Sequence, residues 1–203
     1  MKTTKHIIVA VCLILISING FGCNSGKEEK SGNKDIKVDS TKVSPAVADN
    51  FIEVFYQPPV NWVTLPAQES SQMVEADPQD SVRTLFRYLI SSVYKDTISR
   101  SMLFTGRVKI NNPEMEMDEA IKKWSEDILT KFNPDEITQD RIEINDIEMT
   151  RFRIERTDLI AFKLIFPNSR GEIVQFDYTI RKSAYESLKD AVESSIATIK
   201  ILK

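Results

Sequence analysis

The hydrophobic positions divide this chain into three regions with different patterns. Residues 7–18 form an apolar run that only Ser17 interrupts, whereas residues 24–48 carry scattered Ile and Val among Ser, Lys, Gly and acidic residues. From about Phe51 onwards, apolar residues recur with the periods of strands and helices. We therefore expect one folded domain over residues 49–203, preceded by a flexible tether over residues 23–48.

Apolar residues spaced by three or four positions predict three helices in this domain. The first begins with Asp77 as its N-cap and runs to Val93, and the second spans about residues 118–132. The third opens with Ser183-x-x-Glu186, a capping box. Each helix would bury one apolar stripe against the rest of the domain.

Alternating or continuous apolar runs predict strands between these helices. The expected strands are residues 101–110, 141–144, 147–156, 159–166 and 172–181. Short polar turns such as Asn145-Asp146 separate the later ones, which indicates an antiparallel meander. The fold class is therefore α+β, with an antiparallel sheet flanked by about three helices.

The order of these elements resembles the PsbP-like fold over about residues 51–203. The segments that carry the resemblance are Tyr56-x-x-Pro59-x-x-Trp62, the Asn145-Asp146 hairpin, and Ile199-Lys200-Ile201 at the end of the closing helix. NTF2-like and cystatin-like α+β folds are the alternatives. The resemblance implies a small non-enzymatic domain at a membrane surface beside a larger partner. Photosystem relatives also help retain inorganic ions, but nothing here matches their ion-binding histidines.

Residues 1–22 have the pattern of an export signal. A short cationic start with Lys2 and Lys5 precedes an apolar run that is shorter than the roughly 20 residues of a membrane-spanning helix. The following Gly20-Phe21-Gly22-Cys23 resembles a bacterial lipobox, although Gly20 stands where that family usually has Leu. The resemblance implies that Cys23 becomes the lipidated first residue, carrying acyl chains such as palmitate.

Ordinary signal peptidase could also cleave after Gly22 and release a soluble protein that begins with an unpaired Cys23. Lipidation accounts for this thiol, because the other cysteine, Cys12, lies within the signal. We therefore expect a lipid-anchored protein of the bacterial cell envelope that faces the periplasm or the cell exterior. The expected partners are the membrane, through the N-terminal lipid, and an envelope protein.

Charge and composition make several classes of function unexpected for this chain. Removal of residues 1–22 would leave 25 basic and 30 acidic side chains, a net charge of −5. A mildly acidic chain without a basic block is not expected to bind nucleic acid. The one histidine, His6, lies in the signal, so nucleophile systems that need histidine are not expected. We expect no enzyme activity, no cofactor and no metal site.

Three smaller motifs have ordinary structural explanations. Ser92-x-x-Lys95 has the spacing of a nucleophile and its base, but the companion motifs of that enzyme class are missing. The carboxylates at Glu114, Glu116, Asp118 and Glu119 suit the N-terminus of a helix. Trp62 and Trp124 fall on apolar stripes and are expected in the core.

Four cations are candidates for binding a partner. Arg151 and Arg153 alternate with apolar neighbours, so both should point to the face opposite the core. Together with Arg107 and Lys109 of another strand, they could form a cationic patch for carboxylates or phosphates. A mixed, solvated surface is the alternative. The expected function is thus a non-enzymatic binding or accessory module, with a small-ligand or ion carrier, or an enzyme using only carboxylates, as alternatives.

Overall fold

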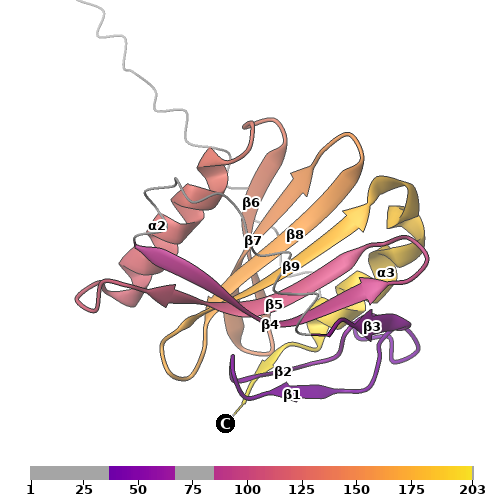
Figure 1. The fold of residues 1–203 in the computed structure, drawn as a ribbon, viewed down its shortest axis with the longest axis horizontal. Helices are drawn as coiled ribbons and strands as arrows, with labels where there is room; N and C mark the ends of the chain where they lie inside the picture. Colours follow the sequence, from indigo (N-terminus) through magenta and orange to yellow (C-terminus); the bar gives the residue numbers. More distant parts are fainter. Residues whose placement is uncertain (1–36, 67–84, 203) are drawn as a thin grey trace, which may run out of the picture.

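The computed structural model describes residues 37–66 and 85–202, which form two antiparallel sheets and two α-helices (Figure 1). Seven strands make the larger sheet, in the order β3 (Trp62–Thr64), β4 (Phe86–Asp96), β5 (Met102–Ile110), β9 (Ile173–Arg181), β8 (Leu159–Pro167), β7 (Ile147–Glu155) and β6 (Ile137–Ile144). The meander β6 to β9 therefore joins the hairpin β4–β5 through the pairing of β9 with β5.

A smaller sheet lies beside the larger one. Its strand order is β1 (Val47–Asp49), β2 (Val54–Tyr56) and β10 (Lys200–Ile201). The last strand of the domain thus pairs with one of its first, and the N–H of Leu202 also donates to the carbonyl oxygen of Glu53 at 2.9 Å.

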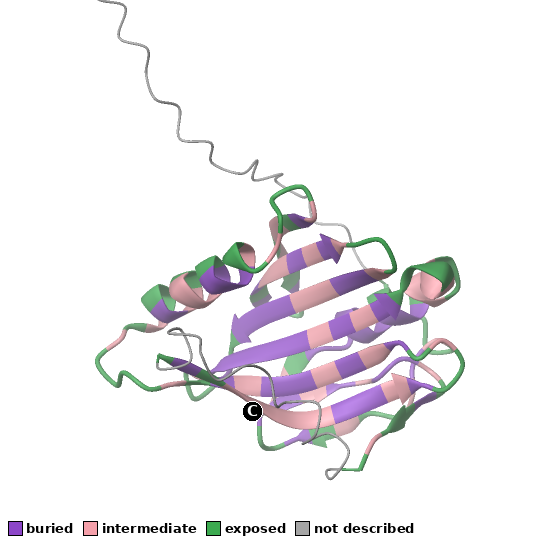
Figure 2. Ribbon diagram, turned by 45° about the horizontal axis from the view of Figure 1, so that its top comes forward, coloured by how far each residue is buried: buried purple, intermediate pink, exposed green. Residues whose placement is uncertain are grey.

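The two helices, α2 (Met117–Thr130) and α3 (Tyr185–Ala197), pack on opposite faces of the larger sheet (Figure 1). Successive side chains of a strand point to opposite faces, so a central strand buried on both sides needs apolar residues at both parities. In β9, Ile173 belongs to the core beneath α2, whereas Val174 belongs to the core beneath α3. Figure 2 shows that buried residues gather along the middle strands.

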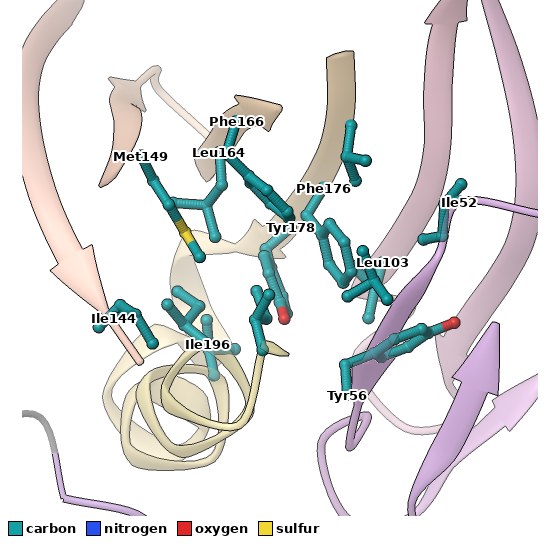
Figure 3. Packing of buried hydrophobic residues seen from close by; sticks show 14 of the residues in the cluster. Ile52, Tyr56, Leu103, Ile144, Met149, Leu164, Phe166, Phe176, Tyr178 and Ile196 are labelled. Atoms are coloured by element: carbon teal, nitrogen blue, oxygen red, sulfur yellow. The ribbon is translucent and has the colours of Figure 1, made fainter. Parts of the chain in front are cut away.

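The core beneath α3 is the larger of the two clusters. Figure 3 shows Phe176 and Tyr178 of β9 between Ile196 of α3 on one side and Tyr56 of β2 on the other. All of these side chains are at most 3% exposed. Because full burial of one large apolar side chain contributes about 1.5–3 kcal/mol, this cluster holds the small sheet and α3 onto the larger sheet.

The meander expected from the sequence is confirmed, because β6 to β9 pair in sequence order and are all antiparallel. The strand expected over residues 101–110 is β5, and the helix expected over residues 118–132 is α2. The third helix is also present, but its capping box is not formed. A short 3-10 turn (Lys182–Ala184) precedes α3, whose N-cap is Ala184, and no side chain caps the helix.

The helix expected from Asp77 to Val93 is wrong in its described part. Residues 77–84 lie outside the described residues, and residues 86–93 belong to strand β4. A β-bulge causes the misleading spacing. The pairing with β5 shifts between Ile90 and Ser92, so Val93 lies on the same face as Phe86 and Ile90. The intervals of four and three residues between these side chains match the spacing of one face of a helix. The described residues therefore contain two α-helices, whereas about three were expected.

The packed domain begins before the boundary expected at residue 49. Val43 is buried and forms an isolated bridge with Pro59. The N–H of Asp39 donates to the hydroxyl of Ser194 on α3 at 3.2 Å. Residues 39–48, expected in the tether, are therefore part of the domain.

Candidate binding surface

The four candidate cations do not form one patch. Strand pairing places Arg107 and Lys109 of β5 on the same face of the sheet as Arg151 and Arg153 of β7. However, β9 and β8 lie between β5 and β7. With neighbouring strands about 4.8 Å apart, the two pairs are separated by roughly 14 Å, and the buried core beneath α3 occupies the space between them.

Arg151 and Arg153 are engaged in ion pairs within the domain. The guanidinium of Arg151 makes a bidentate contact with Asp140 of β6, in which Nε lies 2.9 Å from Oδ1. Arg153 lies 2.7 Å from the carboxylate of Glu155 on its own strand. Their cross-strand neighbours are Leu164 and Phe162, so these arginines lie on a core-bearing face at its border. Intramolecular carboxylates already neutralise both.

A different pair of cations lies exposed at the other side of this face. Arg87 of β4 is directly opposite Lys109 of β5, and both residues are exposed. Neither has an ion-pair partner within residues 37–66 and 85–202. Like charges directly opposite each other in an antiparallel pair destabilise it. No carboxylate of the described residues therefore compensates the repulsion between these two side chains on the hairpin β4–β5.

Arg107, which Glu172 neutralises, lies next to these cations and connects them to the small sheet. Its guanidinium carbon lies 4.3 Å from the centroid of the Phe51 ring, and one of its nitrogens makes a short ion pair with Glu172. The Nε of Arg107 is buried and has no hydrogen-bond partner within the described residues. Cation–π contacts of this kind contribute about 0.5–1 kcal/mol at exposed sites. Arg107 thus holds an aromatic ring, 39% exposed, at the surface.

The β1–β2 turn that carries Phe51 is fixed by several hydrogen bonds. The carboxylate of Asp49 accepts hydrogen bonds from the N–H of Phe51, at 3.0 Å, and from the hydroxyl of Ser91. Ser91 is the residue inserted by the bulge in β4. The bulge therefore has a structural use, because it lets β4 bind the turn above it.

The β8–β9 loop supports the same turn from the other side. The side-chain amide of Asn168 donates to the carbonyl oxygen of Ile52 at 3.2 Å, and Arg170 forms an ion pair with Glu53. Burial by itself raises the pKa of Glu172, but hydrogen bonds from Arg107 and Asn168 outweigh it and hold this pKa below its usual value. Glu172 is therefore ionised near neutral pH and remains engaged with Arg107.

We use the name β4–β5 surface for Phe51, Arg87, Arg107 and Lys109. Sequence reasoning found Arg107 and Lys109 but missed Arg87 and Phe51. Arg87 was missed because its segment was assigned to a helix. The enrichment of β4 in aromatic and β-branched residues, at Phe86, Tyr88, Ile90, Val93 and Tyr94, was the available signal for a strand.

The remaining candidates from the sequence lie apart from this surface. Ser92 and Lys95 point to opposite faces of β4, so the Ser-x-x-Lys spacing does not bring them together. Trp62 is buried, and Trp124 lies partly buried on α2, where its indole N–H donates to the side chain of Gln175 at 2.6 Å.

The carboxylates near the start of α2 are exposed, and Glu119 pairs with Lys123 at 2.7 Å. Within the described ranges, no group of three or more His, Cys, Asp or Glu side chains is arranged to hold a metal ion. Nor does either of the described helices have the length and apolar character needed to cross a membrane. Cys23 lies outside the described residues.

Comparison with known proteins identifies the fold. No protein-family model matches this chain, and no curated protein sequence matches it. The solution structure of cyanobacterial PsbP (CyanoP) from Synechocystis sp. PCC 6803 is similar, with a TM-score of 0.50 and 10% sequence identity over 81% of this chain and 95% of that chain. At this identity the likeness concerns the fold alone, and it confirms the PsbP-like arrangement expected from the sequence.

Proposed function

We propose that this protein is a lipid-anchored, non-enzymatic binding module of the bacterial cell envelope, which attaches to a larger envelope protein as an accessory subunit. The export signal and Cys23 support the location, because both match the pattern of a bacterial lipoprotein. The observation that carries the binding role is the exposed Arg87–Lys109 pair. Its charges weaken the isolated domain and become favourable when a partner supplies negative groups.

The other features of the β4–β5 surface agree with a docking role. Asp49, strand β5 through Arg107, and the β8–β9 loop through Asn168 together fix the turn that carries Phe51. A preorganised aromatic ring loses little conformational freedom on binding, and aromatic residues and arginines are enriched at the centres of interfaces. The surface thus combines an apolar contact with two cations that have no ion-pair partner in the described part of the chain.

The location is tested with Cys23→Ala. We expect this variant to move from the membrane fraction to the soluble fraction of cells, because the residue that receives the lipid is lost. Cys12→Ala is the matched control, and it should leave the protein in the membrane fraction. Unchanged membrane retention of Cys23→Ala would contradict the lipid anchor.

The binding role is tested by cross-linking the protein in intact cells, followed by purification from the detergent-solubilised envelope. We expect one partner protein in near-equal amount. Absence of any stoichiometric partner across several cross-linker lengths would contradict the accessory role.

A further inference from the structure

The chemistry of the β4–β5 surface specifies a class of partner, provided that the protein acts as the binding module proposed above. Arg87 and Lys109 lie side by side and have no ion-pair partner among the described residues, while Arg107 keeps one carboxylate, Glu172, bound beside them. A carboxylate placed between Arg87 and Lys109 would contact both cations and would repeat the Arg107–Glu172 pair.

The apolar part of the surface limits the size and type of the ligand. Phe51 is 39% exposed, and Leu89, a half-buried residue of β4, lies on the same face as Arg87. A free phosphate is too small to cover the cations and the ring together. A protein segment that carries both carboxylates and apolar side chains can contact all of them.

This surface carries few cations for attachment to an anionic membrane. Glu53 and Glu172 are paired with Arg170 and Arg107, so the local excess of positive charge is limited to Arg87 and Lys109, and the whole chain has a formal net charge of −3. A membrane surface attracts polybasic segments of several Lys and Arg residues, with about 1 kcal/mol for each. Two cations that pair with no carboxylate of the described residues suit a local ion pair better than a wide anionic membrane surface.

From these observations we infer that the β4–β5 surface binds an acidic segment of a partner protein, with carboxylates at Arg87 and Lys109 and an apolar side chain at Phe51. The partner therefore need not have a deep pocket. It must present an exposed strand or loop in which acidic and apolar residues are neighbours.

The test uses the processed protein purified from the envelope in a neutral detergent. The probe is a fluorescent peptide in which pairs of Glu alternate with single Leu residues, and binding is followed by anisotropy. Three further measurements accompany it. They use a peptide with Gln in place of Glu, inorganic phosphate as a competitor of the peptide, and vesicles of phosphatidylglycerol or phosphatidylcholine. The variant is Arg87→Gln with Lys109→Gln.

We expect this double variant to bind the Glu–Leu peptide about tenfold more weakly, because each lost exposed ion pair is worth a factor of roughly two to five. The matched control, Lys122→Gln with Arg141→Gln, removes the same charge from exposed positions on α2 and β6 and should bind as the parent does. The Gln–Leu peptide should not bind. Circular dichroism and thermal unfolding of the two double variants should show intact folds.

Several results would overturn the inference. These are unchanged peptide binding by Arg87→Gln with Lys109→Gln, equal loss in the control variant, or stronger binding to phosphatidylglycerol vesicles that depends on Arg87 and Lys109. Displacement of the peptide by phosphate at concentrations similar to that of the peptide would also overturn it.

Cross-linking in cells separates this inference from the proposed function. A partner that co-purifies with the parent and is lost with Arg87→Gln and Lys109→Gln supports both. A partner recovered equally with the double variant leaves the accessory role intact and contradicts the assigned surface. Peptide binding without any stoichiometric partner in cells supports the chemistry of the surface and contradicts the accessory role.

Discussion

The side-chain amide of Asn145 donates two hydrogen bonds, to the backbone carbonyl oxygens of Ala197 at 2.9 Å and Ile199 at 2.8 Å. Asn145 begins the β6–β7 turn, where it and Asp146 both have positive φ angles, of 49° and 64°. Such a turn favours Asn at its first position. The last carbonyls of a helix lack intrahelical partners, so this hairpin turn supplies a donor to the last carbonyl of α3, at Ala197, and to that of Ile199 just beyond the helix.

Replacing Asn145 by Gly should lower the free energy of unfolding by about 1–2 kcal/mol. Glycine tolerates the positive φ, so the loss would come from the missing amide and not from backbone strain. Urea denaturation measures the change. Asp146→Gly is the matched control in the same turn, and equal losses in both variants would show that the amide does not hold α3.

Arg87→Gln should stabilise the isolated domain by about 0.2–1 kcal/mol, because it removes the repulsion with Lys109 across the β4–β5 pair. Arg141→Gln, which breaks the pair that Arg141 makes with Glu148 at 2.9 Å, should instead be neutral or slightly destabilising. The comparison is made by urea denaturation at low ionic strength. Destabilisation by Arg87→Gln would indicate that Lys109 does not repel it.

The buried hydroxyls of Tyr56 and Tyr94 lie 3.0 Å apart, and burial raises the pKa of Tyr56 so that it stays neutral. Tyr56→Phe and Tyr94→Phe should each cost about 1–2 kcal/mol, since each leaves one buried hydroxyl with fewer partners. The double variant should cost less than the sum of the two. Additive losses in this double-mutant cycle would mean that the hydroxyls are not coupled.

The domain should lose stability in acid partly through Glu172. The folded state lowers the pKa of this carboxyl below its ordinary value of 4.5, so its contribution is complete above that value and is lost as the pH falls through the folded-state pKa. Glu172→Gln should therefore flatten the dependence of unfolding free energy on pH below about 4.5. Glu193→Gln, an exposed position on α3, is the matched control, and an equal flattening in both variants would contradict a specific role of Glu172.

The sequence predicted the meander well because its turns and strands agree with each other. Asn145-Asp146 favours a tight hairpin, and the strand β9 shows apolar residues at every second position from Val174 to Ile180. The turn residues and the alternation of apolar residues then predict the same pairing register for the neighbouring strands. The amphipathic helix α2 was predictable for a similar reason, since its apolar stripe packs on the sheet.

The parts that could not be predicted depend on contacts between distant segments. Ser91 is the extra residue of a bulge, and its hydroxyl binds Asp49, which lies 42 positions away. The partner of Arg151 is Asp140, which becomes its neighbour only when β6 and β7 adopt their register. A candidate site predicted from charge and strand period therefore included arginines that form ion pairs within the domain, and it omitted Arg87.

The pairing of β10 with β2 joins residues about 145 positions apart, such as Lys200 and Phe55. Non-local pairing of this kind makes folding slow, because a long loop must close before the contacts form. The small sheet cannot be completed until Lys200 and Ile201 have been synthesised. The turn that presents Phe51 would therefore reach its final position late in biogenesis, and the β4–β5 surface would be complete only after the rest of the domain has assembled.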